Sequence, residues 1–239
     1  MSKFAVLCAT LCWGLSGAVW ADEASIRKNL TERLPNFPAI DEVTKTAIPG
    51  IYELRIGNDI LYTDENGHHV LQGHLIDTKT RANLTEARIA KLTQIDFATL
   101  PLQDAILIKQ GTGARKIAVF GDPNCGYCKR LERDLVGLKD VSIYTFLLPI
   151  LGPDSNAKAR DIWCARDRAK TWRAWMVDGN APSKAGGPCD AGALERNLAL
   201  GERHRVNGTP AIVFEDGTRS PGAMPAEQIE SRLVAAAKR

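Results

Sequence analysis

The chain has 239 residues, of which 44% are hydrophobic, and it carries 31 Lys and Arg against 28 Asp and Glu. This composition is typical of a globular protein with one large or two modest domains. It argues against disorder, collagen-like structure and a small disulfide-only scaffold. A formal net charge of +3 gives no reason to expect nucleic acid or an anionic membrane as a partner.

Residues 1–21 have the pattern of a secretory signal peptide. Lys3 precedes an apolar run, Phe4–Val19, and the run ends at Ala21 before two acidic residues. Because this run is too short for a comfortable transmembrane helix, we predict cleavage after Ala21 and export of residues 22–239. An even number of cysteines in an exported chain favours disulfides, and four remain after cleavage: Cys125, Cys128, Cys164 and Cys189.

Residues 22–79 are predicted to form a small N-terminal domain of one helix and antiparallel strands. Apolar residues recur every four positions over 25–34, which indicates a short amphipathic helix. Alternating apolar residues over 51–77 indicate strands, and Asn66-Gly67 is a strong hairpin turn. Such a domain buries little apolar surface, so we expect it to be stabilised by dimerisation with a second copy.

Residues 80–101 are predicted to be a helical linker. Asn83 resembles a helix N-cap, with Glu86 three residues later, and Pro101 ends the segment.

Residues 102–239 are predicted to form an α/β domain with a helical insertion, so the whole chain has a mixed α+β and α/β organisation. Strands are predicted at 105–109, 116–120, 141–148 and 211–214, and helices at 126–138, 155–178, 191–204 and 225–238.

The sequence Cys125-Gly126-Tyr127-Cys128 lies where a strand ends and a helix begins. Free backbone N–H groups and the helix dipole favour an anion there, and the thiolate is the nucleophilic form of cysteine. The positive charges of Lys129 and Arg130 favour the thiolate further. Cys128, one turn into the helix, is placed to attack a mixed disulfide formed by Cys125.

Two other interpretations of this motif compete. A C-x-x-C pair is half of a zinc site, but no other Cys or His lies near it in the sequence. A purely structural disulfide across two residues removes little loop entropy, so redox chemistry is the better explanation. The histidines at 68, 69 and 74 could bind a metal, yet such residues are more often solvated strand residues. We therefore predict no metal and no cofactor.

Cys164 and Cys189 flank the predicted helical insertion. We expect a structural disulfide between them, worth about 3.5 kcal/mol by loop entropy, with a second redox pair as the alternative. Further along, Thr209-Pro210 precedes a strand and is a candidate cis peptide bond. Such a loop presents the backbone of Thr209 for pairing with an extended substrate chain.

These motifs together resemble the DsbC-type protein disulfide isomerases of the thioredoxin superfamily. The resemblance covers nearly the whole mature chain. It is carried by the segment 120–129 around the Cys-Gly-Tyr-Cys motif, the loop 208–211, and the hairpin 61–73 in the first half. It implies that Cys125 and Cys128 are catalytic, that Cys164 and Cys189 form the family's structural disulfide, and that the substrate-binding residues are Gly126, Tyr127, Thr209 and Pro210.

The resemblance also implies a V-shaped homodimer in the periplasm that joins through the N-terminal domains and binds misfolded, wrongly disulfide-bonded exported proteins. A membrane electron donor of the DsbD type would keep Cys125 reduced. The sequence departs from the family pattern at Pro123-Asn124. It departs again at Val119, because thioredoxin has a proton-transferring acid at that position. Asp122 is nearer to the motif, but the sequence alone assigns it no role.

We therefore predict a thiol–disulfide interchange enzyme that isomerises or reduces non-native disulfides and has associated chaperone activity. One alternative is a DsbG-like reductase of sulfenylated cysteines, against which Gly126 and the second cysteine pair count. The other is a chaperone or peptide-binding module whose thiols are incidental.

Overall fold

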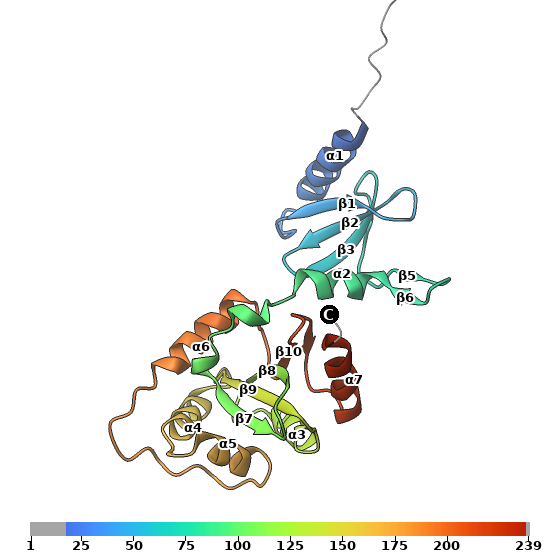
Figure 1. Cartoon of the computed structure of the whole chain (residues 1–239). Helices are drawn as coiled ribbons and strands as arrows, with labels where there is room; N and C mark the ends of the chain where they lie inside the picture. Colours follow the sequence, from blue (N-terminus) through green and yellow to red (C-terminus); the bar gives the residue numbers. More distant parts are fainter. Residues whose placement is uncertain (1–17, 238–239) are drawn as a thin grey trace, which may run out of the picture. The chain divides into compact units, whose positions relative to one another are not determined.

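The computed structural model describes residues 18–237, with side chains from Glu23 onward. These residues form two compact units, and the boundary between them falls between Ile89 and Ala90. Figure 1 shows the elements of each unit. The predicted signal peptide lies almost entirely outside the described residues.

The first unit is built from one long helix and a small antiparallel sheet. Its elements are α1 (Ala18–Arg33), β1 (Glu42–Lys45), β2 (Ile51–Ile56), β3 (Asp59–Asp64), β4 (Val70–Leu71), β5 (Ile76–Asp77), β6 (Ala82–Asn83) and α2 (Leu84–Leu92). The first four strands form one sheet in chain order, and β5 pairs with β6. The core of this unit lies between α1 and the sheet, where Ile26 and Leu30 pack on Val43, Tyr52 and Leu54.

The predicted turn at Asn66-Gly67 connects β3 to β4. Gly67 adopts a φ of +61°, and its N–H donates to the carbonyl of Asp64. A side chain at this position would also meet Leu30 of α1, because a Cβ would lie 3.2 Å from Leu30 Cγ. Glycine is therefore favoured here both by the backbone angle and by the close approach of the helix.

The segment predicted as a helical linker is only partly helical. The α-helix ends at Leu92, and residues 97–99 and 102–104 form two short 3₁₀ helices. Ile95, Phe97 and Leu100 are buried in a core cluster of the second unit. Burial of these apolar residues therefore makes the end of the segment part of the second unit.

The second unit contains a five-stranded mixed sheet with helices on both faces. Its elements are β7 (Ile106–Gln110), β8 (Arg115–Gly121), α3 (Gly126–Leu135), β9 (Val141–Leu147), α4 (Pro153–Trp163), α5 (Arg168–Met176), α6 (Gly192–Arg203), β10 (Ala211–Phe214), β11 (Arg219–Pro221) and α7 (Ala226–Ala236). The strand order is β11-β10-β8-β9-β7, in which β8 and β9 are parallel and the other pairs are antiparallel. This arrangement confirms the predicted α+β fold class.

Alternate residues of the central strands face two separate cores. Ile117 and Val119 lie in the core that contains residues of α3, α4, α5 and α7 and Ala193 of α6, whereas Ala118 and Phe120 lie in the core that contains Leu200 of α6. Because successive side chains of a strand point to opposite faces, a continuous apolar run is needed to fill both layers.

The helical insertion differs from the single helix predicted at 155–178. It consists of α4 and α5, which are separated at residues 164–167. Asp167 caps the second helix, since its side chain accepts a hydrogen bond from the N–H of Lys170. Capping by Asp at an interior position restarts a helix, and a 3.6-residue periodicity does not detect such a break.

Within residues 18–237, no helix is both long and apolar enough to cross a membrane.

Candidate active site

Cys125 lies at the N-terminus of α3, directly after the loop that follows β8. Its side chain accepts a hydrogen bond from the backbone N–H of Cys128, at a distance of 3.2 Å between nitrogen and sulfur. The N–H of Cys125 itself donates to the carbonyl of Asp122 and closes the loop as a turn. A sulfur that caps a helix receives an N–H donor and lies at the positive end of the helix dipole, so Cys125 is positioned at the start of α3 for nucleophilic attack.

Cys128 is more deeply placed than Cys125, and neither cysteine is in a disulfide. Burial raises the pKa of the Cys128 thiol far above its ordinary value, and its interaction with Cys125 acts in the same direction. Gly126 and Tyr127 between them are exposed, and the Tyr127 side chain is one of the most exposed large apolar groups of the unit. The geometry therefore suits first attack by Cys125, while Cys128 remains a protonated thiol.

The loop before β10 lies against the first sulfur. The Thr209-Pro210 peptide bond is cis, and Cys125 Sγ lies 3.3 Å from the carbonyl oxygen of Thr209. The register of β10 on β8, in which Ala211 pairs with Phe120, brings the two loops together at one end of the sheet. A substrate cysteine bonded to Cys125 would consequently lie beside the backbone of Thr209.

The loop before Cys125 is anchored to α4 through Asp122. This carboxylate is fully buried and accepts hydrogen bonds from Ser155 Oγ at 2.7 Å, from the N–H of Leu151 at 2.9 Å and from the N–H of Asn124 at 2.7 Å. Asn124 Nδ2 also donates to Asp154 Oδ2. Asp122, to which the sequence assigned no role, is therefore the structural anchor of the active-site loop.

Trp175 of α5 holds the same loop from a second helix. Its indole N–H donates to the carbonyl of Pro123 at 2.6 Å, and the ammonium group of Lys129 lies 3.6 Å from the centre of its ring. Burial lowers the pKa of Lys129, and the positive charges of Lys158 and Arg133 add to this effect. The helical insertion thus supports the loop that carries Cys125.

Cys164 and Cys189 are joined by a disulfide that connects the end of α4 to the segment before α6. Their Cα atoms are 5.8 Å apart. Trp163 Nε1 donates to the carbonyl of Asp190 beside this bond. The disulfide therefore fixes the insertion that supports the active-site loop.

Sequence reasoning missed Glu132. It lies on α3 and is almost fully buried, and burial raises its pKa to about 7, although Trp172 and Arg173 oppose the shift. The signal was present in the sequence: Glu132 occupies the i+4 position of a stripe whose other members are Cys128, Leu131 and Leu135. A charged residue within the buried stripe of a helix is a marked exception to amphipathic patterning.

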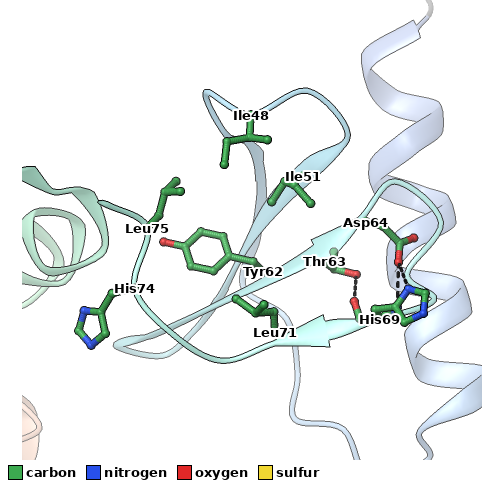
Figure 2. A pocket seen from close by; sticks show the side chains of 9 residues that line it. All are labelled: Ile48, Ile51, Tyr62, Thr63, Asp64, His69, Leu71, His74 and Leu75. Atoms are coloured by element: carbon green, nitrogen blue, oxygen red, sulfur yellow. Dashed lines mark hydrogen bonds and ion pairs between the residues drawn. The ribbon is translucent and has the colours of Figure 1, made fainter. Parts of the chain in front are cut away.

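The first unit contains a separate apolar cavity of about 350 Å³ (Figure 2). It is lined by Ile48, Ile51, Tyr62, Thr63, Asp64, His69, Leu71, His74 and Leu75. Asp64 accepts hydrogen bonds from both the backbone N–H and the ring of His69. Leu71 lies on the short strand β4 at the edge of its sheet and is 60% exposed. An apolar hollow next to a sheet edge is typical of a surface that a protein partner covers.

Two family models together match most of the chain. Residues 17–86 match the disulfide bond isomerase protein N-terminal domain, and residues 102–237 match the thioredoxin-like domain. Among solved structures, a crystal structure of a disulfide interchange protein from Neisseria gonorrhoeae has a TM-score of 0.54 and 40% sequence identity. It covers 57% of this chain and 98% of that one.

Curated relatives agree with these matches. The probable thiol:disulfide interchange protein DsbC of Bordetella parapertussis is 46% identical over 87% of this chain and 73% of its own length. The thiol:disulfide interchange protein DsbC of Dickeya dadantii is 35% identical over 98% of this chain and 96% of its own length. The chain therefore belongs to the DsbC family of thiol:disulfide interchange proteins and is an enzyme of thiol–disulfide exchange.

Proposed function

We propose that this chain isomerises or reduces non-native disulfides in exported proteins, with Cys125 as the nucleophile. The observation that carries the proposal is the position of the Cys125 sulfur. It caps α3, accepts the N–H of Cys128 and lies 3.3 Å from the carbonyl oxygen of Thr209. One sulfur is thereby placed both for attack and for holding a substrate chain against an extended backbone segment.

The reaction proceeds by thiol–disulfide exchange. The Cys125 thiolate attacks one sulfur of a substrate disulfide, a bond forms between Cys125 and that sulfur, and the second substrate sulfur leaves as a thiolate. The backbone of Thr209 holds the substrate strand while this mixed disulfide exists. A different substrate thiolate then attacks the mixed disulfide, which releases Cys125 and completes an isomerisation. When no substrate thiol is in reach, Cys128 attacks Cys125 and releases a reduced substrate.

Two assays on cysteine variants test this scheme. Cys125→Ala should abolish both the reactivation of scrambled ribonuclease and the reduction of insulin. Cys128→Ala should keep part of the reactivation, because substrate thiols can still resolve the mixed disulfide, but it should lose the reduction of insulin. Full reactivation by Cys125→Ala would exclude the proposal.

A reductase of sulfenylated cysteines is the nearest alternative within this chemistry. Such an enzyme also needs a reactive first cysteine, so the geometry of Cys125 alone does not separate the two activities. The assay that separates them measures reduction of a sulfenylated protein beside reactivation of scrambled ribonuclease, at equal enzyme concentration. We expect reactivation of scrambled ribonuclease to be the stronger of the two activities.

We further propose an associated chaperone activity. Three large apolar side chains are exposed at or near the redox site, on α3 and on the loop after β9: Tyr127, Ile150 and Leu151. The N–H of Leu151 donates to the Asp122 carboxylate, so the loop after β9 is held against the active-site loop. Suppression of aggregation that persists after Cys125→Ala and Cys128→Ala are combined would support this activity. Loss of suppression in that double variant would contradict it.

We propose that the N-terminal unit forms a homodimer by covering the cavity of Figure 2 with a second copy. The match of residues 17–86 to the disulfide bond isomerase N-terminal domain supports this partner. So do the exposed apolar residues at the edge, because Val70 and Leu71 of β4 are both exposed. Sedimentation of the mature protein tests the assembly state.

The remaining expectations concern location and electron supply. We propose that the protein works in the periplasm after removal of residues 1–21, where a membrane donor of the DsbD type reduces Cys125 and Cys128. The disulfide between Cys164 and Cys189 supports an oxidising compartment. Isolation of the mature protein from the periplasmic fraction, with its N-terminus sequenced, tests export and cleavage.

A further inference from the structure

A buried carboxylate lies one turn beyond the second cysteine on the active-site helix. Glu132 and Cys128 are four positions apart on α3, and both belong to its buried face. Side chains at i and i+4 are neighbours on a helix, with Cβ atoms about 5–6 Å apart. Because helical side chains lean toward the helix N-terminus, the Glu132 side chain lies over the turn that carries Cys128.

The surroundings of Glu132 contain polar atoms that have not found hydrogen-bond partners. Among the described residues, Glu132 Oε1, Trp172 Nε1 and Arg173 Nε are buried and have no hydrogen bond of standard geometry. An unpartnered oxygen of a buried carboxylate costs free energy, and here it lies on α3, the helix that carries Cys128. Oε1 of Glu132 can therefore accept a proton without giving up an existing hydrogen bond.

Arg173 of α5 is the charged group that faces Glu132. The other charged residues of α3 and α5 are in contact with other groups or more exposed. Lys129 lies over the ring of Trp175, and Arg168 lies over the ring of Trp163. Asp134 is half-buried, and the exposed charged residues are Arg130, Arg133 and Lys170. The ionisation of Glu132 therefore depends on burial, on the indole of Trp172 and on one neighbouring cation, Arg173.

Cys128 needs a proton acceptor because its thiol is buried and strongly favours the protonated form. Three acidic residues are buried within residues 23–237: Asp104, Asp122 and Glu132. Asp104 is paired with Arg196, and Asp122 accepts three hydrogen bonds, one each from the loop before Cys125, the loop after β9 and α4. Glu132 is the buried acid that remains.

We propose that Glu132 accepts the proton of Cys128 when Cys128 attacks the mixed disulfide. This inference rests on the proposed function of Cys125. It adds the residue that deprotonates Cys128 when Cys128 attacks the mixed disulfide. The proton passes from Cys128 Sγ to the Glu132 carboxylate, and the resulting thiolate attacks Cys125 Sγ. The bond between Cys125 and the substrate breaks as the bond between the two cysteines forms. The substrate leaves as a thiolate and takes up a proton from Glu132 or from solvent.

An aromatic disulfide that releases a coloured thiolate tests the proposal in single-turnover stopped-flow experiments. The first release reports attack by Cys125, and the second reports attack by Cys128 on the mixed disulfide. Cys128→Ala should show only the first release and so assigns the two phases. Glu132→Gln should slow the second phase by about tenfold or more near neutral pH and change the first by less than about twofold.

The matched control is Asp134→Asn, which removes one negative charge from the same helix at a half-buried position. It should leave both phases unchanged. In the unmodified protein, the second phase should accelerate with an inflection close to pH 7, where the carboxyl group of Glu132 ionises. This inflection should be absent from Glu132→Gln.

Arg173→Met provides a second variant that keeps the carboxylate. Because Arg173 lowers the pKa of Glu132, its removal should move the inflection of the second phase to higher pH. A second phase of normal rate and pH dependence in Glu132→Gln would overturn the proposal. Equal slowing of both phases would also overturn it, because that result indicates a general effect on the helix. Loss of the first phase in Cys125→Ala tests the proposed function separately.

Discussion

The sulfur of Cys125 lies 3.3 Å from the carbonyl oxygen of Thr209, which stands 84 positions later in the chain. The carbonyl and N–H groups of Thr209 are therefore placed beside any chain that is covalently attached to Cys125. A substrate can be held by backbone hydrogen bonds, which every polypeptide offers, rather than by a pocket for one side chain. This arrangement allows one site to hold substrate chains of different sequence.

Backbone pairing at Thr209 predicts sensitivity to the substrate's own amide groups. A peptide disulfide whose amide next to the cysteine is N-methylated should form the mixed disulfide with Cys128→Ala more slowly, by about three- to tenfold. Loss of one hydrogen bond accounts for this factor. Methylation of an amide several residues away serves as the control, and equal rates for the two peptides would exclude backbone pairing.

The hydrogen bond from Ser155 to Asp122 predicts a stability effect. Ser155→Ala leaves one oxygen of a fully buried carboxylate with fewer donors, so the free energy of unfolding should fall by about 1–3 kcal/mol. Urea unfolding measures this change. Ser183→Ala, at an exposed position of the insertion, should change stability by less than about 0.5 kcal/mol. Similar values for the two variants would contradict the anchoring role of Asp122.

Glu132 predicts a loss of stability as the pH rises. Its pKa is about 7 in the folded chain, against an ordinary value of 4.5, so the folded state holds a proton that the unfolded state releases between these values. The free energy of unfolding should therefore fall by roughly 3 kcal/mol from pH 4.5 to pH 7 on account of this group. Glu132→Gln should remove that fall, whereas Asp134→Asn should retain it. Urea unfolding at a series of pH values provides the comparison.

We predict that the disulfide between Cys164 and Cys189 contributes to the stability of the fold but takes no part in the redox reaction. Replacing Cys164 and Cys189 together by Ala opens a loop with a sequence separation of 25, which should lower the free energy of unfolding by about 3.5 kcal/mol. Where the double variant remains folded, the two release phases of Cys125 and Cys128 should persist. Loss of both phases in a folded double variant would show that the second pair takes part in the redox reaction.

The cavity of the first unit predicts the assembly state. Leu71→Glu places a charge on an exposed apolar residue that lines this cavity, so it should shift the mature protein from dimer to monomer in sedimentation. Leu107→Glu, at an exposed apolar position of the second unit, should leave the dimer intact. A dimer that survives Leu71→Glu would place the interface elsewhere.

Much of the fold could be predicted from periodicity and turn chemistry. The strand at 211–214 was predicted with the bounds that the structure has, and most other elements of the second unit were displaced by only a few residues. The predicted and observed elements differ where side-chain packing or capping, rather than hydrophobic periodicity, determines the local structure. Asp167 restarts a helix inside the insertion, and Ile95, Phe97 and Leu100 of the predicted linker are buried in a core of the second unit.

The sequence by itself determined the local chemistry: two cysteines at a helix start, a Thr-Pro bond before a strand, and a second pair of cysteines around an insertion. These features depend on residues close together in the chain, where backbone geometry follows from residue type. Only the tertiary structure decided which distant groups meet. Antiparallel pairing of β10 with β8 places Thr209 against Cys125, and packing of α5 beside α3 buries Glu132 among Trp172 and Arg173. The physical reason is that such contacts, and the desolvation that shifts the pKa of Glu132, arise from the packing of whole elements.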